Sequence, residues 1–163
     1  MKNSIPIVNY IAESYQLAMK SEEHRDVMIE IIKSKIVDKC MHSLFANGTL
    51  DPLRDPGLFR DHIFQIIGDL EHKVDGVFMD YVISDVLNIL FKMVDMLLSE
   101  GLYRDNDQSL FKLMRGVALK LNNTVKRQIT LERILELREN IDLQKPNDDI
   151  LKFIQNLMKS RVL

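Results

Sequence analysis

Apolar residues along this chain recur at intervals of three and four positions and almost never alternate with polar ones. Such intervals place apolar side chains on one face of an α-helix, whereas strict alternation is typical of a half-buried β-strand. Short polar stretches containing glycine, proline, asparagine or aspartate separate the periodic segments. The pattern therefore predicts an all-α protein. The expected helices cover residues 6–19, 21–45, 56–74, 77–99, 107–122, 124–140 and 148–162.

Residues suited to begin and end helices lie at these boundaries. Ser4, Ser21, Asp55 and Asp107 stand where a side-chain oxygen can accept a hydrogen bond from a first-turn amide. Asn47-Gly48 can adopt the left-handed conformation that ends many helices. The other expected chain reversals lie at residues 75–76, 101–106 and 145–148.

The segment 77–99 is the most apolar part of the chain. Its apolar residues cover more than one helical stripe, which predicts a central helix with neighbours on both sides. Short connections imply that consecutive helices lie antiparallel. Seven helices, several of them long and paired, fit a short HEAT-like α-solenoid better than a four-helix bundle. Because low-complexity tracts and long linkers are absent, we expect residues 1–163 to form one helical domain.

The composition is that of a globular protein with little net charge. Hydrophobic residues make up 46% of the 163 residues and charged residues 28%, and the formal net charge is −2. Near-neutrality gives no general attraction to DNA or RNA. No apolar run approaches the about 18 residues of a membrane span, and the first residues lack a secretion signal. We therefore expect a cytosolic protein that contacts neither membrane nor nucleic acid.

Two of the four histidines stand at helical spacing from an aspartate, as metal ligands on one helix can. Asp69 and His72 are three residues apart, and Asp38 and His42 are four apart, so each pair lies on one face of a helix. A di-iron bundle needs two Glu-x-x-His pairs and two further inward glutamates, which this chain lacks. The pattern therefore favours histidines at the surface or at the edge of the core over a metal site.

No sequence motif indicates catalysis. Cys40 lies on the apolar stripe of a predicted helix, where cysteine behaves as a small buried hydrophobe rather than a reactive thiolate. A nucleophile elbow, a phosphate-binding glycine loop and a His-Glu-x-x-His run are all absent. We therefore expect a binding protein that is not an enzyme and uses no cofactor.

Basic residues gather near the end of the predicted helix 107–122 and in the helix that follows it. They are Arg115, Lys120, Lys126, Arg127 and Arg133. Acidic residues interrupt the group and no aromatic residues are interleaved, so the pattern alone favours a solvated helix face over a patch for an acidic partner.

Four stretches of the sequence carry a resemblance to a known family. The first is residues 21–23 together with the predicted helix that follows and ends at 40–44. The second is 64–68, the third runs from 86–90 to 97–99, and the fourth runs from 108–115 to 120–121. Their order and spacing resemble the helical C-terminal domain that follows the TOG array in the ch-TOG/Minispindles family of microtubule polymerases. The resemblance covers residues 21–163. The chain departs from the family at Lys112 and Arg115, where an arginine and an asparagine are usual.

The resemblance implies a non-catalytic interaction domain, and one that is a fragment of a larger protein. In the family, the C-terminal region recruits the polymerase to centrosomes and the mitotic spindle through TACC-type coiled-coil adaptors. Separate TOG domains bind tubulin, so this domain would meet tubulin only indirectly. An acidic, amphipathic coiled coil would find complementary charge near Lys112, Arg115, Lys120 and Arg127, which we take as the expected partner-binding residues.

Two other interpretations fit the same sequence. One is a helical protein of a pathogen or phage that binds a host factor, with a homodimer as one form. The other is a helical-bundle enzyme with a metal or an organic cofactor. A metal assay and an absorption spectrum would separate the enzyme from the two binding proteins.

Overall fold

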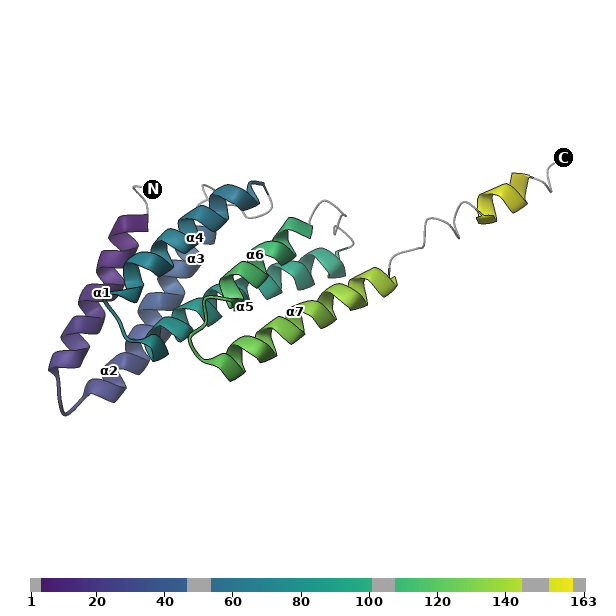
Figure 1. Cartoon of the computed structure of the whole chain (residues 1–163). Helices are drawn as coiled ribbons and strands as arrows, with labels where there is room; N and C mark the ends of the chain where they lie inside the picture. Colours follow the sequence, from purple (N-terminus) through teal and green to yellow (C-terminus); the bar gives the residue numbers. More distant parts are fainter. Residues whose placement is uncertain (1–3, 47–53, 101–107, 145–152, 160–163) are drawn as a thin grey trace.

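The computed structural model describes residues 4–46, 54–100, 108–144 and 153–159. Within these ranges the chain is all-α and contains no β-strand, which confirms the predicted class (Figure 1). Residues 153–159 form a further helical stretch. The elements are α1 (Ser4–Lys20), α2 (Arg25–Ile31), the π-helical η1 (Ile32–Val37), α3 (Asp38–Ala46), α4 (Pro56–Glu71), α5 (Gly76–Ser99), α6 (Gln108–Ala118) and α7 (Thr124–Gln144).

The predicted helix 21–45 begins later than expected and is not uniform. Ser21 is not its cap, because α2 begins at Arg25 and its N-cap residue, His24, makes no side-chain capping bond. The Ser21 amide instead donates to the Ala18 carbonyl at 3.1 Å, and Arg25 Nη2 donates to the Met19 carbonyl at 2.8 Å. These bonds satisfy carbonyls at the end of α1, so this stretch closes one helix before opening the next. η1 then joins α2 to α3 without a break.

Aspartates begin α4 and α5 as capping residues. The Asp55 side chain accepts from the Leu58 amide at 3.0 Å, and Pro56 occupies the first helical turn, as the sequence predicts. The Asp75 side chain accepts from the Phe78 amide at 2.8 Å. Its second oxygen accepts from the Tyr15 hydroxyl at 2.8 Å, so the same aspartate that starts α5 also ties that helix to α1.

α5 is the central helix, as its apolar sequence predicts. It packs against η1, α3, α4 and α6, and its buried side chains point to several sides. The apolar ones are Phe78, Met79, Val82, Ile83, Val86, Leu87, Ile89, Leu90, Phe91, Val94 and Leu97. α1 packs against α4 and the α2–η1 rod, so the described helices share one hydrophobic core around α5.

α7 lies along one edge of the helices and packs mainly on α6 (Figure 1). Ile134 and Ile141 are its buried side chains within the described part of the chain. Ile129 and Leu135, two apolar residues of the same helix, are exposed. A helix with one main neighbour buries only a narrow stripe, so apolar residues beyond that stripe remain in contact with solvent.

The last predicted helix is helical where it is described, but the apolar residues described there are not buried. All seven residues of 153–159 are exposed, including Phe153, Ile154, Leu157 and Met158. The expected cap at Asp107 and the reversals at 47–48, 101–106 and 145–148 lie outside the described residues. α6 also ends earlier than predicted, at Ala118 rather than Asn122.

Candidate partner-binding surface

α6 presents two of the four expected binding residues on its exposed side. Lys112 and Arg115 are exposed and stand three positions apart, which makes them neighbours on the helix surface. The apolar residues between and around them are buried, among them Phe111, Leu113 and Met114. The helix is therefore held by its apolar side, and its cations face outward.

A groove of about 390 Å³ lies between α6 and α7. Phe111, Leu131, Ile134 and Leu135 form its apolar surface. Lys112 and Arg115 line it from α6, and Arg138 lines it from α7. No lining residue is acidic, so the groove combines an apolar floor with a cationic rim.

Lys120 and Arg127, the other two expected residues, make contacts within the protein instead. Lys120 Nζ lies over the Phe64 ring, 5.4 Å from its centroid. Arg127 Nη1 donates to the Leu121 carbonyl at 3.5 Å. Neither residue lines the groove. The structure thus brings Lys112 and Arg115 together in the groove and gives Lys120 and Arg127 structural contacts.

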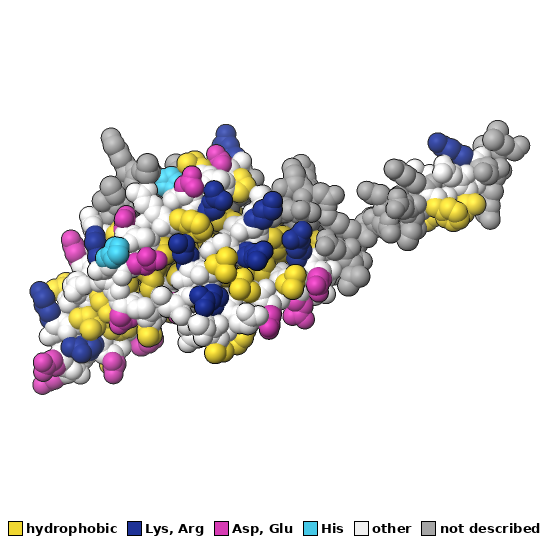
Figure 2. Space-filling view, in the orientation of Figure 1, with side chains coloured by type: hydrophobic (Ala, Val, Ile, Leu, Met, Phe, Trp, Pro, Cys, Tyr) yellow, Lys and Arg dark blue, Asp and Glu magenta, His cyan; other side chains and the backbone are white. Residues whose placement is uncertain are grey.

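The cations of the groove have no ion-pair partner in the part of the chain that the structure describes. The ion pairs found there join His24 to Glu23, Lys33 to Glu30 and Arg60 to Asp61. Figure 2 shows Lys and Arg side chains gathered over α6 and its neighbours, with hydrophobic side chains between them. This face can therefore offer both positive charge and apolar area to a ligand.

Asp80 fixes the turn that sets α7 beside α6. Its carboxylate, buried in α5, accepts from the Asn122 amide at 2.7 Å, from Asn122 Nδ2 at 3.2 Å and from the Asn123 amide at 2.9 Å. Asn123 Oδ1 in turn accepts from the Lys126 amide at 3.0 Å, which caps the start of α7. The expected helix 124–140 was given no cap, although an asparagine directly before a helix is a recognisable N-cap signal.

Two further residues determine how closely α6 and α7 pack on the other helices. The Arg133 guanidinium lies 3.8 Å from the centroid of the Phe91 ring, which holds α7 to α5 through a cation–π contact. A Cβ at Gly116 would meet Phe64 Cζ at 3.2 Å, so the glycine permits close approach of α6 to α4. The groove is thus built on a fixed pair of helices rather than on a loop.

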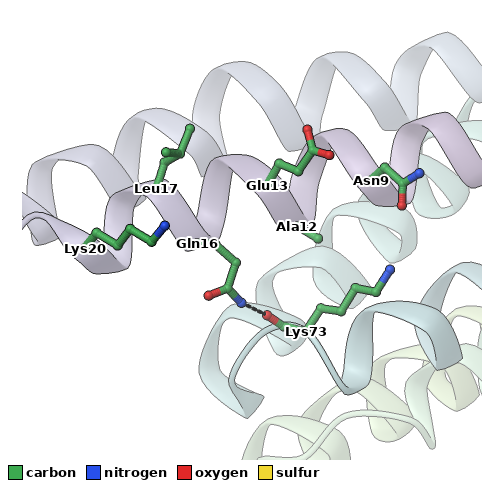
Figure 3. A pocket seen from close by; sticks show the side chains of 7 residues that line it. All are labelled: Asn9, Ala12, Glu13, Gln16, Leu17, Lys20 and Lys73. Atoms are coloured by element: carbon green, nitrogen blue, oxygen red, sulfur yellow. Dashed lines mark hydrogen bonds between the residues drawn. The ribbon is translucent and has the colours of Figure 1, made fainter.

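A second open cavity, of about 490 Å³, lies beside α1 (Figure 3). Gln16 Nε2 donates to the Lys73 carbonyl at 2.7 Å across it. Its lining mixes one carboxylate, Glu13, with the two cations of Lys20 and Lys73. Figure 3 shows Glu13 and Lys20 spread along α1 and Lys73 on the facing segment, so the three side chains do not converge on one point. The cavity therefore offers neither a reactive cluster nor a single sign of charge.

A group of titratable side chains lies between α3 and α5. The Tyr81 hydroxyl donates to Asp38 Oδ1 at 3.0 Å and to the Lys33 carbonyl at 3.1 Å. Burial first, and then the hydrogen bond to Asp38, raise the pKa of Tyr81 to about 12. Burial and the neighbouring Asp38 carboxyl raise the pKa of Asp85 to about 7. Tyr81 therefore stays protonated at neutral pH, whereas Asp85 stays protonated only up to about pH 7.

We expect the free energy of unfolding to fall as the pH rises from 3.8 to about 7, the interval between the pKa of a free aspartate and that of Asp85. The folded state keeps the Asp85 proton up to about pH 7, whereas the free side chain releases it near 3.8, so the folded state binds more protons in between. Urea unfolding at about pH 5 should give a larger free energy than at about pH 8. Asp85→Asn should reduce this difference, and Asp95→Asn, an exposed change on the same helix, should not. An unchanged difference in the Asp85 variant would contradict the assignment.

The histidines and the cysteine differ in burial within the described part of the chain. His24, His42 and His72 are exposed, whereas His62 is buried and its burial lowers its pKa. His62 was not singled out from the sequence, although its position one turn after Phe59 places it on the buried stripe. Burial raises the pKa of the half-buried Cys40 thiol. Across residues 4–46, 54–100, 108–144 and 153–159, no three His, Cys, Asp or Glu side chains form a metal-binding group.

Comparisons with known proteins find no match among family models, curated proteins or solved structures. In the described ranges, no helix has the length and apolar character needed to cross a membrane.

Proposed function

We propose that this chain is a non-catalytic protein-interaction domain of a microtubule polymerase. In this proposal it docks a TACC-type coiled-coil adaptor, which recruits the polymerase to centrosomes and the mitotic spindle. The larger protein binds tubulin through other domains. The observation that carries the proposal is the groove between α6 and α7, in which cations without ion-pair partners in the described residues border an apolar floor.

The chemistry of such an adaptor fits this surface. Coiled coils present apolar seams flanked by charged positions, and an acidic one would complement Lys112 and Arg115. Charge complementarity of this kind raises the association rate and fixes the orientation of the partner. The exposed cations of α6 are therefore the first contact that we assign to the adaptor.

We also propose that the helices form a short HEAT-like stack. Each helix after α1 packs on a neighbour close in sequence, and α7 forms one edge of the arrangement (Figure 1). In a helical stack each repeat contacts mainly its neighbours, and the terminal helices have a free side. The free side of α6 and α7 is then the surface available to a partner.

Reversing the charge at the α6 side of the groove is the test of this function. We expect Lys112→Glu with Arg115→Glu to weaken binding of a TACC-type coiled coil by about tenfold or more, because attraction at the rim becomes repulsion. Fluorescence anisotropy with labelled coiled coil, at two salt concentrations, measures the change. Lys35→Glu with Lys39→Glu, which reverses two exposed charges on the η1–α3 rod, is the matched control and should bind normally. Equal affinity of the two double variants would contradict the proposal.

A further inference from the structure

We infer that the α6–α7 groove receives one amphipathic helix with acidic flanks, which lies along α7 and is held from both sides by cations. The inference deepens the proposed function and rests on it for the identity of the adaptor, while the shape and charge of the groove define the ligand class. It adds Leu135 and Arg138 to the binding surface, two residues that the sequence did not indicate.

The spacing of the α7 side chains is that of a helix-binding face. Leu131, Ile134, Leu135 and Arg138 all line the groove, and their positions follow the i, i+3, i+4, i+7 pattern. Four residues at these intervals form a continuous stripe along one side of a helix. A second helix lying beside this stripe would pack its own apolar residues, spaced three or four apart, onto Leu131 and Leu135.

The apolar floor has exposed area left to bury. Phe111 and Ile134 are buried at the base of the groove, and Leu131 is half-buried. Leu135 is 56% exposed, although it lies beside these residues. A leucine at the edge of an apolar groove gains contacts when a partner covers it, and such buried anchors dominate binding affinity.

The charge of the groove selects an acidic ligand. Lys112 and Arg115 stand on the α6 wall and Arg138 stands on the α7 wall, so both edges of a bound helix would meet a cation. Carboxylates on both flanks of the ligand would form charge-assisted hydrogen bonds with these groups. The chain's own helical stretch 153–159 has apolar residues but no acidic one, so it does not match this requirement.

A second copy of the chain is the main competing occupant. Val27 and Ile31 of α2 are exposed one turn apart, and they border an open cavity together with Asp26 and Glu30. This face of α2 resembles the proposed ligand helix, because it combines apolar residues one turn apart with neighbouring acidic residues. We nevertheless assign the groove to a separate acidic helix, because the rod that begins with α2 continues with the exposed cations Lys35 and Lys39, which would meet the cations of the groove with like charge.

The test compares two exposed apolar residues of α7. Leu135 lines the groove, whereas Ile129, 60% exposed on the same helix, does not. The probe is a labelled peptide of about 14 residues, long enough to form a helix, with leucines at i and i+4 and glutamates on both flanks. We expect Leu135→Glu to weaken its binding about tenfold or more and Ile129→Glu to leave it unchanged. A peptide with lysines in place of the glutamates should not bind.

The outcomes separate this inference from the proposed function. Normal peptide binding by Leu135→Glu, or binding of the lysine peptide, would overturn the groove assignment. Adaptor binding that is lost in the Lys112/Arg115 variant but unaffected by Leu135→Glu would overturn the groove and leave the adaptor function standing. Peptide binding through Leu135 without any adaptor binding would support the groove and refute the adaptor. Concentration-dependent dimers that Arg138→Glu abolishes would assign the groove to a second copy and overturn the inference.

Discussion

Asp80→Ala is expected to lower the free energy of unfolding by about 3 kcal/mol, because hydrogen bonds to a buried charged group are among the stronger ones. Asp80 is only 5% exposed, and its carboxylate accepts three hydrogen bonds from Asn122 and Asn123. Alanine would leave those N–H groups without their acceptor and open a space under the α6–α7 turn. Urea unfolding followed by circular dichroism measures the loss.

Asp95→Ala is the control for this change. Asp95 lies on the same helix but is exposed, and a surface substitution of this kind usually shifts stability by less than about 0.5 kcal/mol. The Asp80 variant should also loosen α7, because the carboxylate holds the turn from which α7 starts. Similar unfolding midpoints for the two variants would show that the buried carboxylate does not hold the turn.

Phe78→Ala should destabilise the protein by about 4 kcal/mol, the usual cost of deleting a buried phenylalanine. The Phe78 ring is buried in the first turn of α5, with its centroid 4.9 Å from that of Tyr15. The substitution removes a contact between α1 and α5 and leaves a cavity that the rigid helices cannot close. Since a domain of this size is stable by about 5–15 kcal/mol, a large share of the folding free energy would be lost.

Val77→Ala tests whether this effect belongs to the buried ring. Val77 precedes Phe78 in α5 and is 78% exposed, so its loss should change stability little. Thermal unfolding of the two variants under the same conditions gives the comparison. Equal shifts in Tm would mean that the start of α5, rather than the packing of Phe78, responds to substitution.

The fold class followed from the sequence because hydrophobic periodicity is a local signal. Asp55 caps α4 where predicted, and the apolar segment 77–99 is the buried central helix. The predicted start of the second helix at Ser21 was wrong, because the chain makes a turn there before α2 begins. Arg25 reaches back to the Met19 carbonyl, and no local propensity of Ser21 indicates this contact. The π-helical stretch η1 likewise has no signature in the intervals of the apolar residues.

The candidate surface could be predicted only in part. Lys112 and Arg115 were named as complementary charge for an acidic coiled coil, and the amphipathic pattern of α6 leaves both of them exposed. Whether such a cation contacts another side chain of the protein depends on residues that are distant in the sequence. Lys120 lies on Phe64 of α4, and this contact requires the packed helices. Arg138 and Leu135 face the groove only because α7 docks on α6, so they could not be recognised before the docking was known.

The described structure places the distinctive chemistry of this chain on its surface. The buried polar groups, such as Asp80 and Asp75, hold helices in position through backbone amides. The Tyr81 side chain keeps its proton at neutral pH, and Asp85 releases its proton near pH 7, so this pair makes the stability of the protein depend on pH. The surface that we propose for binding is the cationic, partly apolar face of α6 and α7.

Hydrogen exchange of the chain, measured with and without a saturating acidic coiled coil, tests most directly whether that face binds the partner. We expect slower exchange in α6 and α7, with little change in α1 and α2. Slower exchange confined to α1 and α2, or no change in any helix at saturation, would contradict the assignment.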